Sequence, residues 1–119
     1  MPAERDTAVM SYDVDLADRV REILTGEPGV TQKRMFGGLA FLVAGNLAVS
    51  ASSYGGLLLR VDPAQSDALT TGSRASRFVM RGREMTGWLA VDIDAAATDD
   101  ELRGWVDRGV DYARSLPPK

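Results

Sequence analysis

Hydrophobic positions recur with helical spacing near both ends of the chain. The first such segment places Leu16, Val20, Ile23 and Leu24 on one helical face. Asp13 stands before them as a side chain able to cap the first backbone N–H groups. Two glycines and a proline follow within a few residues and end the periodic stretch. The pattern predicts an amphipathic helix with one buried stripe.

The second helical segment is opened by Thr98-Asp99-Asp100-Glu101. This is a capping box, in which a hydroxyl and a carboxylate each satisfy a free backbone N–H, and the two aspartates favour the positive helix end. Two consecutive prolines, Pro117 and Pro118, end it. Its apolar stripe, which we expect to pack on a sheet, is Leu102, Trp105, Val106, Gly109, Val110, Ala113 and Leu116.

Between these helices the pattern changes to short apolar runs, which predict strands. A run over Val30–Val43 is followed by Gly45–Asn46, a pair suited to a hairpin turn, and by Leu47–Val49. A second turn at Tyr54–Gly56 leads into Leu57–Val61. Because such short connections join antiparallel neighbours, these residues predict a meander of three strands.

The rest of the middle region predicts a short helix and a second hairpin. Asp62 and Pro63 form a helix opening, and residues 71–77 read as a loop. Phe78–Met80 and Gly87–Val91 bracket a glycine-containing turn. The order is α-β-β-β-α-β-β-α, which predicts an α+β two-layer sandwich in which helices pack on a five-stranded antiparallel sheet.

Length and composition fit one globular domain. The chain has 119 residues, 45% hydrophobic and 26% charged. We expect a flexible tail over residues 1–10 and a single domain over residues 11–117. The longest apolar run is about half of the roughly 20 residues that a membrane-spanning helix needs, and no signal peptide opens the chain. These features predict a cytoplasmic protein.

The chain contains neither cysteine nor histidine. Disulfides, thiolate nucleophiles, Cys/His zinc sites, Ser-His-Asp triads and imidazole acid–base chemistry are therefore excluded. Carboxylate, lysine or tyrosine chemistry and a hard-metal site with oxygen ligands stay open. The sequence predicts no cofactor and no catalytic residue, and we expect a protein that is not an enzyme.

Charge is segregated along the chain. Residues 1–27 and residues 84–119 each have a net charge of −4, whereas residues 28–83 carry seven bases and two acids. One interpretation is that acidic helices and a basic sheet neutralise one another. The other is an anion or partner site in the basic middle. The candidate residues for that site are Lys33, Arg34, Arg74, Arg77, Arg81 and Arg83, with Arg60 also in the basic segment.

The most distinctive stretch is Lys33 to Val43, where a basic pair precedes a double glycine and an apolar run. Gly37 and Gly38 could let backbone N–H groups approach an anion beside Lys33 and Arg34. The spacing is not that of a known phosphate loop, and a double glycine in a strand pattern more often marks a bulge or a close helix–strand contact. We favour the structural interpretation.

Other candidates also have structural interpretations. Asp92 and Asp94, like Asp99 and Asp100, could form a metal or acid–base pair, but solvated turns and helix capping account for them. Trp88 and Trp105 could line a ligand pocket or a dimer surface. We expect them instead to pack in the core, where they would meet between the layers.

The motif Arg34, Met35, Phe36, Gly37 and Gly38 is placed between a helix and a hairpin. Together with the apolar strand after it, Gly45–Asn46, the strands within Phe78–Val91 and the terminal helix ending at Ala113–Pro117, it resembles the N-terminal domain of the TfoX/Sxy competence regulators. The resemblance covers about Met10 to Pro117. It implies a fold similar to the secretion-chaperone-like class.

The resemblance also implies a bacterial regulatory or protein-interaction role, tied in full-length members to DNA-uptake competence. The second, helical domain of those regulators has no counterpart in this sequence, and the family offers no catalytic residues to carry over. We therefore expect a regulatory or adaptor domain that binds a protein partner, with a homodimer as one form of that partnership. Nucleic-acid or small-anion binding through the basic residues is the alternative, and no membrane partner is expected. An enzyme using carboxylates or Lys33 is a third hypothesis.

Overall fold

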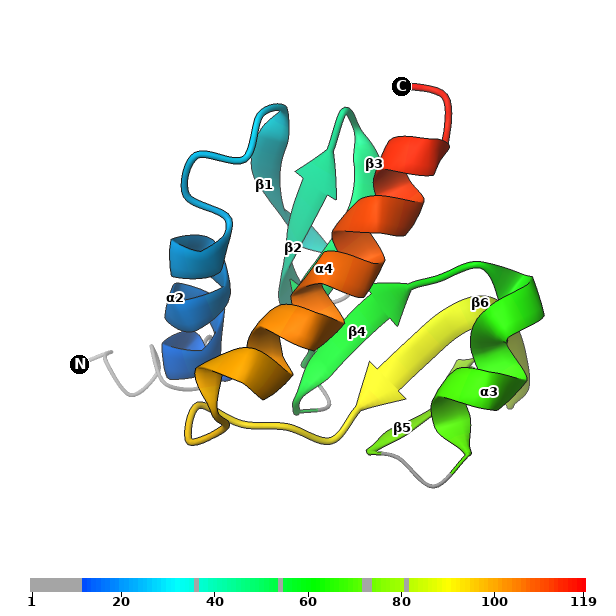
Figure 1. Ribbon diagram of the computed structural model, residues 1–119. Helices are drawn as coiled ribbons and strands as arrows, with labels where there is room; N and C mark the ends of the chain where they lie inside the picture. Colours follow the sequence, from blue (N-terminus) through cyan, green and yellow to red (C-terminus); the bar gives the residue numbers. More distant parts are fainter. Residues whose placement is uncertain (1–11, 36, 54, 72–73, 81) are drawn as a thin grey trace.

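The computed structural model describes residues 12–35, 37–53, 55–71, 74–80 and 82–119. The expected N-terminal tail lies outside these ranges. The described residues form an α+β fold with one antiparallel sheet, whose strand order is β1-β2-β3-β4-β6-β5 (Figure 1). The strands are β1 (Val30–Met35), β2 (Gly38–Val43), β3 (Asn46–Ala51), β4 (Leu57–Arg60), β5 (Ala75–Met80) and β6 (Arg83–Val91).

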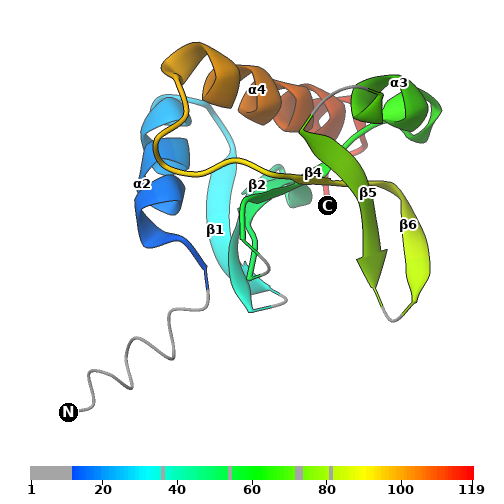
Figure 2. The ribbon, with the colours of Figure 1, turned by 90° about the horizontal axis from the view of Figure 1, so that it is seen from below.

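The helices lie on one side of the sheet (Figure 2). They are α2 (Val14–Ile23), the short α3 (Ser66–Thr70) and α4 (Asp99–Ser115), with a 3-10 turn at Pro63–Gln65 before α3. The predicted caps are confirmed, since the side chains of Asp13, Asp62 and Thr98 each accept a backbone N–H at a helix start. None of the described helices combines the length and the apolar character required to cross a membrane.

The sheet has six strands, so the prediction of five was wrong. The run Val30–Val43 is two strands joined by a turn, with Met35 opposite Gly38. Gly37 has φ 77°, a conformation that favours glycine. A Cβ added to Gly38 would lie 2.2 Å from the carbonyl oxygen of Ala51 on β3. The double glycine therefore makes a hairpin turn and a close strand contact, not a bulge under a helix. Phe36 lies outside the described residues.

Two smaller predictions also need correction. In the β2–β3 hairpin the turn residues are Ala44 and Gly45, with φ of 52° and 86°, and not Gly45 and Asn46. Asn46 is instead a buried strand residue whose Nδ2 donates to the carbonyl of Pro117 at 2.9 Å. Residues 71–77 are not all loop, because β5 begins at Ala75, where it pairs with Val91.

The core lies between the helices and the sheet. Apolar residues of α2 and α4 pack on alternate residues of the strands, and the predicted stripe of α4 is buried at five of its seven positions. A Cβ on Gly109 of α4 would lie 2.3 Å from the carbonyl oxygen of Ala48, so the helix sits directly on the β3 backbone. Arg19 of α2 donates to the carbonyls of Ala95 and Ala97 and to Asp99, which ties α2 to the start of α4.

The sheet is arched, and both of its ends bend away from the helices (Figure 2). We call the side that faces the helices the covered face and the opposite side the inner face. On the inner face, one row of cross-strand partners starts at Lys33 on the edge strand β1 and runs over the other five strands through Ala40, Ser50, Leu58, Ala90 and Ser76. The fold thus leaves one broad side of the sheet without a helix among the described elements.

Candidate functional site

The basic residues that the sequence proposed as a site fall into two groups. Lys33 and Arg34 lie on β1, whereas Arg74, Arg77 and Arg83 lie in or beside the β5–β6 hairpin. β1 and β5 are the two opposite edges of the sheet. Lys33 therefore does not lie beside the arginines of the hairpin, and these residues do not form one continuous patch. Arg81 is outside the described residues.

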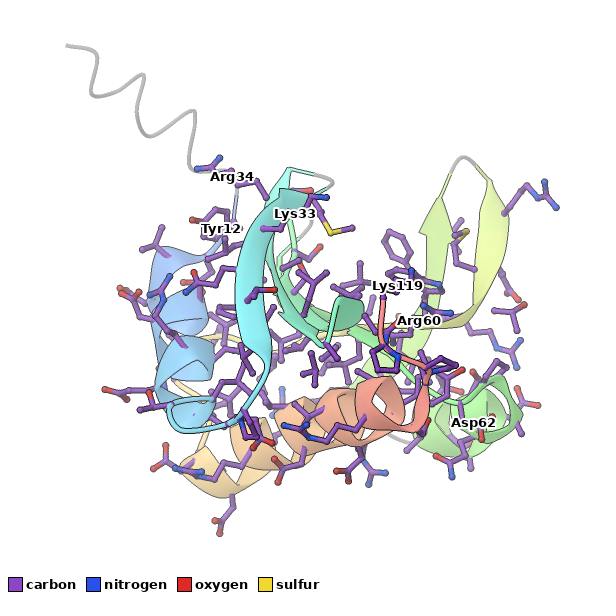
Figure 3. All side chains as sticks on the ribbon, turned by 90° about the horizontal axis from the view of Figure 1, so that it is seen from above. Tyr12, Lys33, Arg34, Arg60, Asp62 and Lys119 are labelled. Carbon is purple, nitrogen blue, oxygen red and sulfur yellow. The ribbon has the colours of Figure 1, made fainter. Side chains whose placement is uncertain are left out.

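Most of these arginines have partners within the fold. The Arg34 guanidinium lies 5.8 Å from the ring centroid of Tyr12 (Figure 3). Arg74 forms an ion pair with Glu101 at 2.6 Å, so the predicted reciprocal cap by the Glu101 carboxylate gives way to an ion pair. Arg77 is paired with both Asp67 and Glu84. This agrees with the interpretation that acidic and basic segments neutralise one another.

Of the predicted site residues that the structure describes, Lys33 and Arg83 are exposed and have neither an ion-pair partner nor an aromatic ring beside them. Arg60 is half-buried, and its guanidinium lies 5.6 Å from the Trp88 ring centroid and 6.0 Å from that of Tyr112. These three cations come from different strands. They offer single positive charges at separate places.

Two of the four carboxylates that the sequence offered as acid–base or metal pairs make contacts within the fold. Asp94 accepts the N–H of Ala96 at 2.9 Å, and Asp99 pairs with Arg19. Asp92 is exposed, and its backbone N–H donates to the carbonyl of Arg74. Among the described residues, no three acidic side chains gather closely enough to hold a metal ion.

The two tryptophans do not meet between the layers, which corrects that prediction. Trp105 of α4 is half-buried and packs against the core. Trp88 pairs with Arg60 across the sheet and alternates along β6 with the core residues Leu89 and Val91. Because successive side chains of a strand point to opposite faces, Trp88 belongs to the inner face.

The middle of the inner face is apolar, although an antiparallel sheet with helices on one side commonly turns polar residues to water on the other. From β2 to β5 its central row contains no charged residue, and Leu42 and Trp88 are half-buried beside it. Two cations stand at its margins, since Lys33 of β1 is the partner of Ala40 and Arg60 is the partner of Trp88. Ala40, Ser50 and Leu58 are each less than 6% exposed, so side chains fill the deepest part of the arch. Closer to the β5–β6 hairpin, side chains no longer fill the space under the arch.

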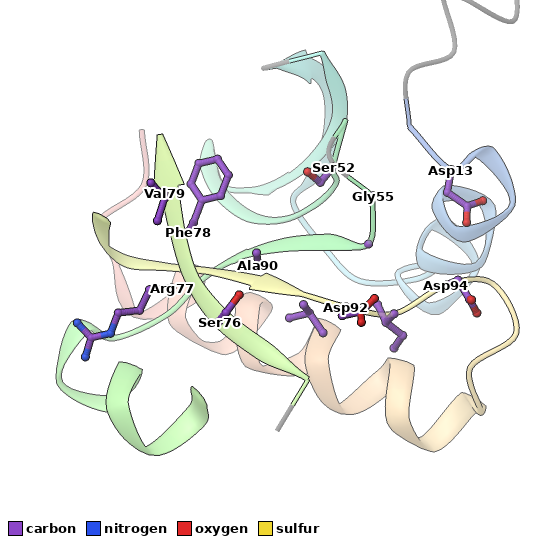
Figure 4. A pocket seen from close by; sticks show the side chains of 13 residues that line it. Asp13, Ser52, Gly55, Ser76, Arg77, Phe78, Val79, Ala90, Asp92 and Asp94 are labelled. Atoms are coloured by element: carbon purple, nitrogen blue, oxygen red, sulfur yellow. The ribbon is translucent and has the colours of Figure 1, made fainter. Parts of the chain in front are cut away.

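There the inner face contains a groove of about 630 Å³ (Figure 4). Ala90 and Ser76 line it from the sheet, with Phe78 and Val79 at one end. The β3–β4 turn borders it at Ser52, Gly55 and Gly56, and the segment after β6 and the start of α2 supply Asp92, Asp94 and Asp13. Asp13 accepts the N–H of Leu16, and Asp94 accepts the N–H of Ala96. All three acids border the same space.

This groove was not predicted from the sequence. Asp92 and Asp94 were considered only as a catalytic or metal pair, and Val79 only as a strand residue. The available signal was the alternation of Leu58, Ala90 and Ser76 with core residues, which marks a second apolar face. The position of Asp13 beside Asp94 could not be read from the sequence, because it depends on how α2 meets the end of β6.

Comparison with known proteins gives one match. No curated protein and no solved structure is similar enough to be matched to this chain. The family model of the TfoX N-terminal domain matches residues 22–113, which span β1 to β6 and nearly all of α4. Since this match covers most of the chain, the protein belongs to the TfoX N-terminal domain family.

Proposed function

We propose that the chain is a non-enzymatic regulatory or adaptor domain that acts by binding another protein. The observation that supports this function is the inner face, which is apolar in its middle, carries no helix among the described elements and is hollowed by a groove. An apolar surface with a polar border is typical of protein interaction sites. The acids at one end of the groove supply such a border.

Two other functions have less support. An enzyme that uses Lys33 would need that side chain near a cleft, but Lys33 does not line the groove and is exposed on the edge strand β1. A nucleic-acid site would need a continuous basic surface. The cations are divided between two sheet edges, and Arg74 and Arg77 are neutralised by acids.

Photo-crosslinking in the native cell tests the proposal. A crosslinking amino acid would be placed at three exposed positions. These are Ser76 in the groove, Thr31 on β1, at the far part of the inner face opposite Leu42, and Asp107 on the outer side of α4. We expect a discrete protein adduct from Ser76. A protein that gives no adduct from any position, or that crosslinks to DNA at low salt, would contradict the proposed function.

A further inference from the structure

The apolar end of the groove is formed by the β5–β6 hairpin. Val79 is 53% exposed, the more exposed of the two large hydrophobic side chains that stand open to solvent in the described residues. Phe78 beside it is 6% exposed and also lines the groove, and Ala90 forms part of the floor (Figure 4). Val79 would lose most of its contact with water if an apolar side chain entered this end.

The opposite end of the groove is acidic. Asp13, Asp92 and Asp94 border it, and Arg77 is the single base among the described residues that line it. The Arg77 side chain points away towards α3 (Figure 4), where Asp67 and Glu84 pair with it. Arg74, which donates to the backbone carbonyl of Asp92 at 3.3 Å, is itself paired with Glu101. The aspartates therefore leave this end of the groove with a net negative charge, which attracts a positive one.

The size of the groove limits what can occupy it. A space of about 630 Å³ accommodates a few side chains, as do ordinary ligand pockets, but not a folded domain. Its shape and charge together call for an elongated occupant with an apolar part and a cationic part. A peptide segment with a hydrophobic residue near a lysine or arginine has both.

We infer that the groove binds a short segment of a partner protein. An apolar side chain of that segment packs against Phe78 and Val79, and a nearby lysine or arginine lies beside Asp92 and Asp94. The inference deepens the proposed function and rests on it, since it assigns the protein-binding activity to one end of the inner face and states the chemistry of the partner.

A peptide selection tests the inference. Random dodecapeptides displayed on phage would be selected on the full chain immobilised through a biotin after Lys119, and the best binder would be synthesised with a fluorescent label. We expect the retained peptides to combine an apolar residue with lysine or arginine. In anisotropy titrations, Val79→Ser and Asp92→Lys should each weaken binding by about ten-fold, as expected for residues that anchor the two ends of the peptide.

Matched variants separate a local effect from a general one. Val14→Ser removes the second exposed valine, and Asp107→Lys makes the same charge change on α4, and neither residue lines the groove. Both should bind the peptide like the wild type. A peptide in which glutamate replaces the basic residue should bind Asp92→Lys more tightly than it binds the wild type.

Several results would overturn the inference. The first is a selection that retains no peptide, or retains peptides that bind Val79→Ser and Asp92→Lys unchanged. A dimer that Val79→Ser dissociates in light scattering would make a second copy the occupant, and binding gained only on deletion of residues 1–10 would make it the chain's own N-terminal segment. A crosslink from Asp107 alone would keep the proposed function and reject the groove.

Discussion

The covered and inner faces of the sheet are built from alternate residues of the same strands. On the covered face one row of partners reads Leu39, Ala51, Leu57, Val91 and Ala75, all in the core cluster. The adjacent row on the inner face is Ala40, Ser50, Leu58, Ala90 and Ser76. Large aliphatic side chains gather where helices cover them, and smaller ones where no helix does.

This contrast teaches that burial alone does not distinguish a core from a binding surface. Leu57 and Leu58 are 0% and 3% exposed, so both are buried. Leu57 belongs to the core cluster under α4, whereas Leu58 lies in the arch on a row that leads to the groove. The energetic difference between the faces can therefore be measured with matched substitutions.

The largest expected effect compares these two leucines. Leu57→Ala should lower the free energy of unfolding by about 3 kcal/mol, because the helices above it leave a cavity that cannot collapse. Leu58→Ala should cost about half as much, roughly 1.5 kcal/mol, since the side chains of the arch can move into the space. Urea unfolding followed by tryptophan fluorescence gives both values. Equal losses would mean that the two faces are packed alike.

The second prediction concerns the contact that holds α4 on the covered face. Gly109→Ala should destabilise the protein by about 2 kcal/mol, because the added methyl meets the β3 backbone at Ala48. Gly104→Ala is the control, since a Cβ there meets nothing within 4 Å. It should stabilise the helix by up to about 1 kcal/mol. A Gly109→Ala variant as stable as the control would contradict the close contact.

The third prediction tests the start of the covering helix. Thr98→Ala removes the hydroxyl that accepts the N–H of Glu101 at 3.2 Å. The expected loss is about 1 kcal/mol, the usual value of a helix cap. Thr98→Ser should retain most of the stability, because serine offers the same acceptor. Thermal unfolding by circular dichroism would detect the difference, and an unaffected Thr98→Ala would show that α4 does not depend on this cap.

The smallest expected effect lies on the inner face. Val79→Ser should change the free energy of unfolding by no more than about 0.5 kcal/mol, because the valine is largely exposed. The same variant is expected to bind the selected peptide about ten-fold more weakly. A clearly destabilised Val79→Ser would place this residue in the packed structure and weaken the distinction between the two faces.

Local patterns in the sequence predicted much of the fold. The caps at Asp13, Asp62 and Thr98 and the stripe of α4 depend on neighbouring residues, and all were found where expected. The run Val30–Val43 was wrongly predicted as one strand, because its double glycine is its only turn signal and was interpreted as an irregularity within that strand. Gly38 lies close to Ala51 of another strand. The need for a glycine at this position therefore cannot be predicted from the neighbouring residues in the sequence.

The candidate site was less predictable for the same reason. Lys33 and Arg77 belong to one basic segment in the sequence but lie on the two opposite edge strands of the sheet. Conversely, Asp13 and Asp94 are far apart in the sequence and border one groove. Neither relation follows from composition or spacing, because both depend on the order of the strands.

The bonds made by the last residues of the chain have a practical consequence. The carbonyl of Pro117 accepts Asn46 Nδ2, and the N–H of Lys119 donates to the carbonyl of Ala44, so the chain's end is held at the β2–β3 turn. The groove lies beside the β3–β4 turn, at the other end of strand β3. A label or an immobilising anchor attached after Lys119 would therefore leave from the far end of the arch, with the groove facing solution.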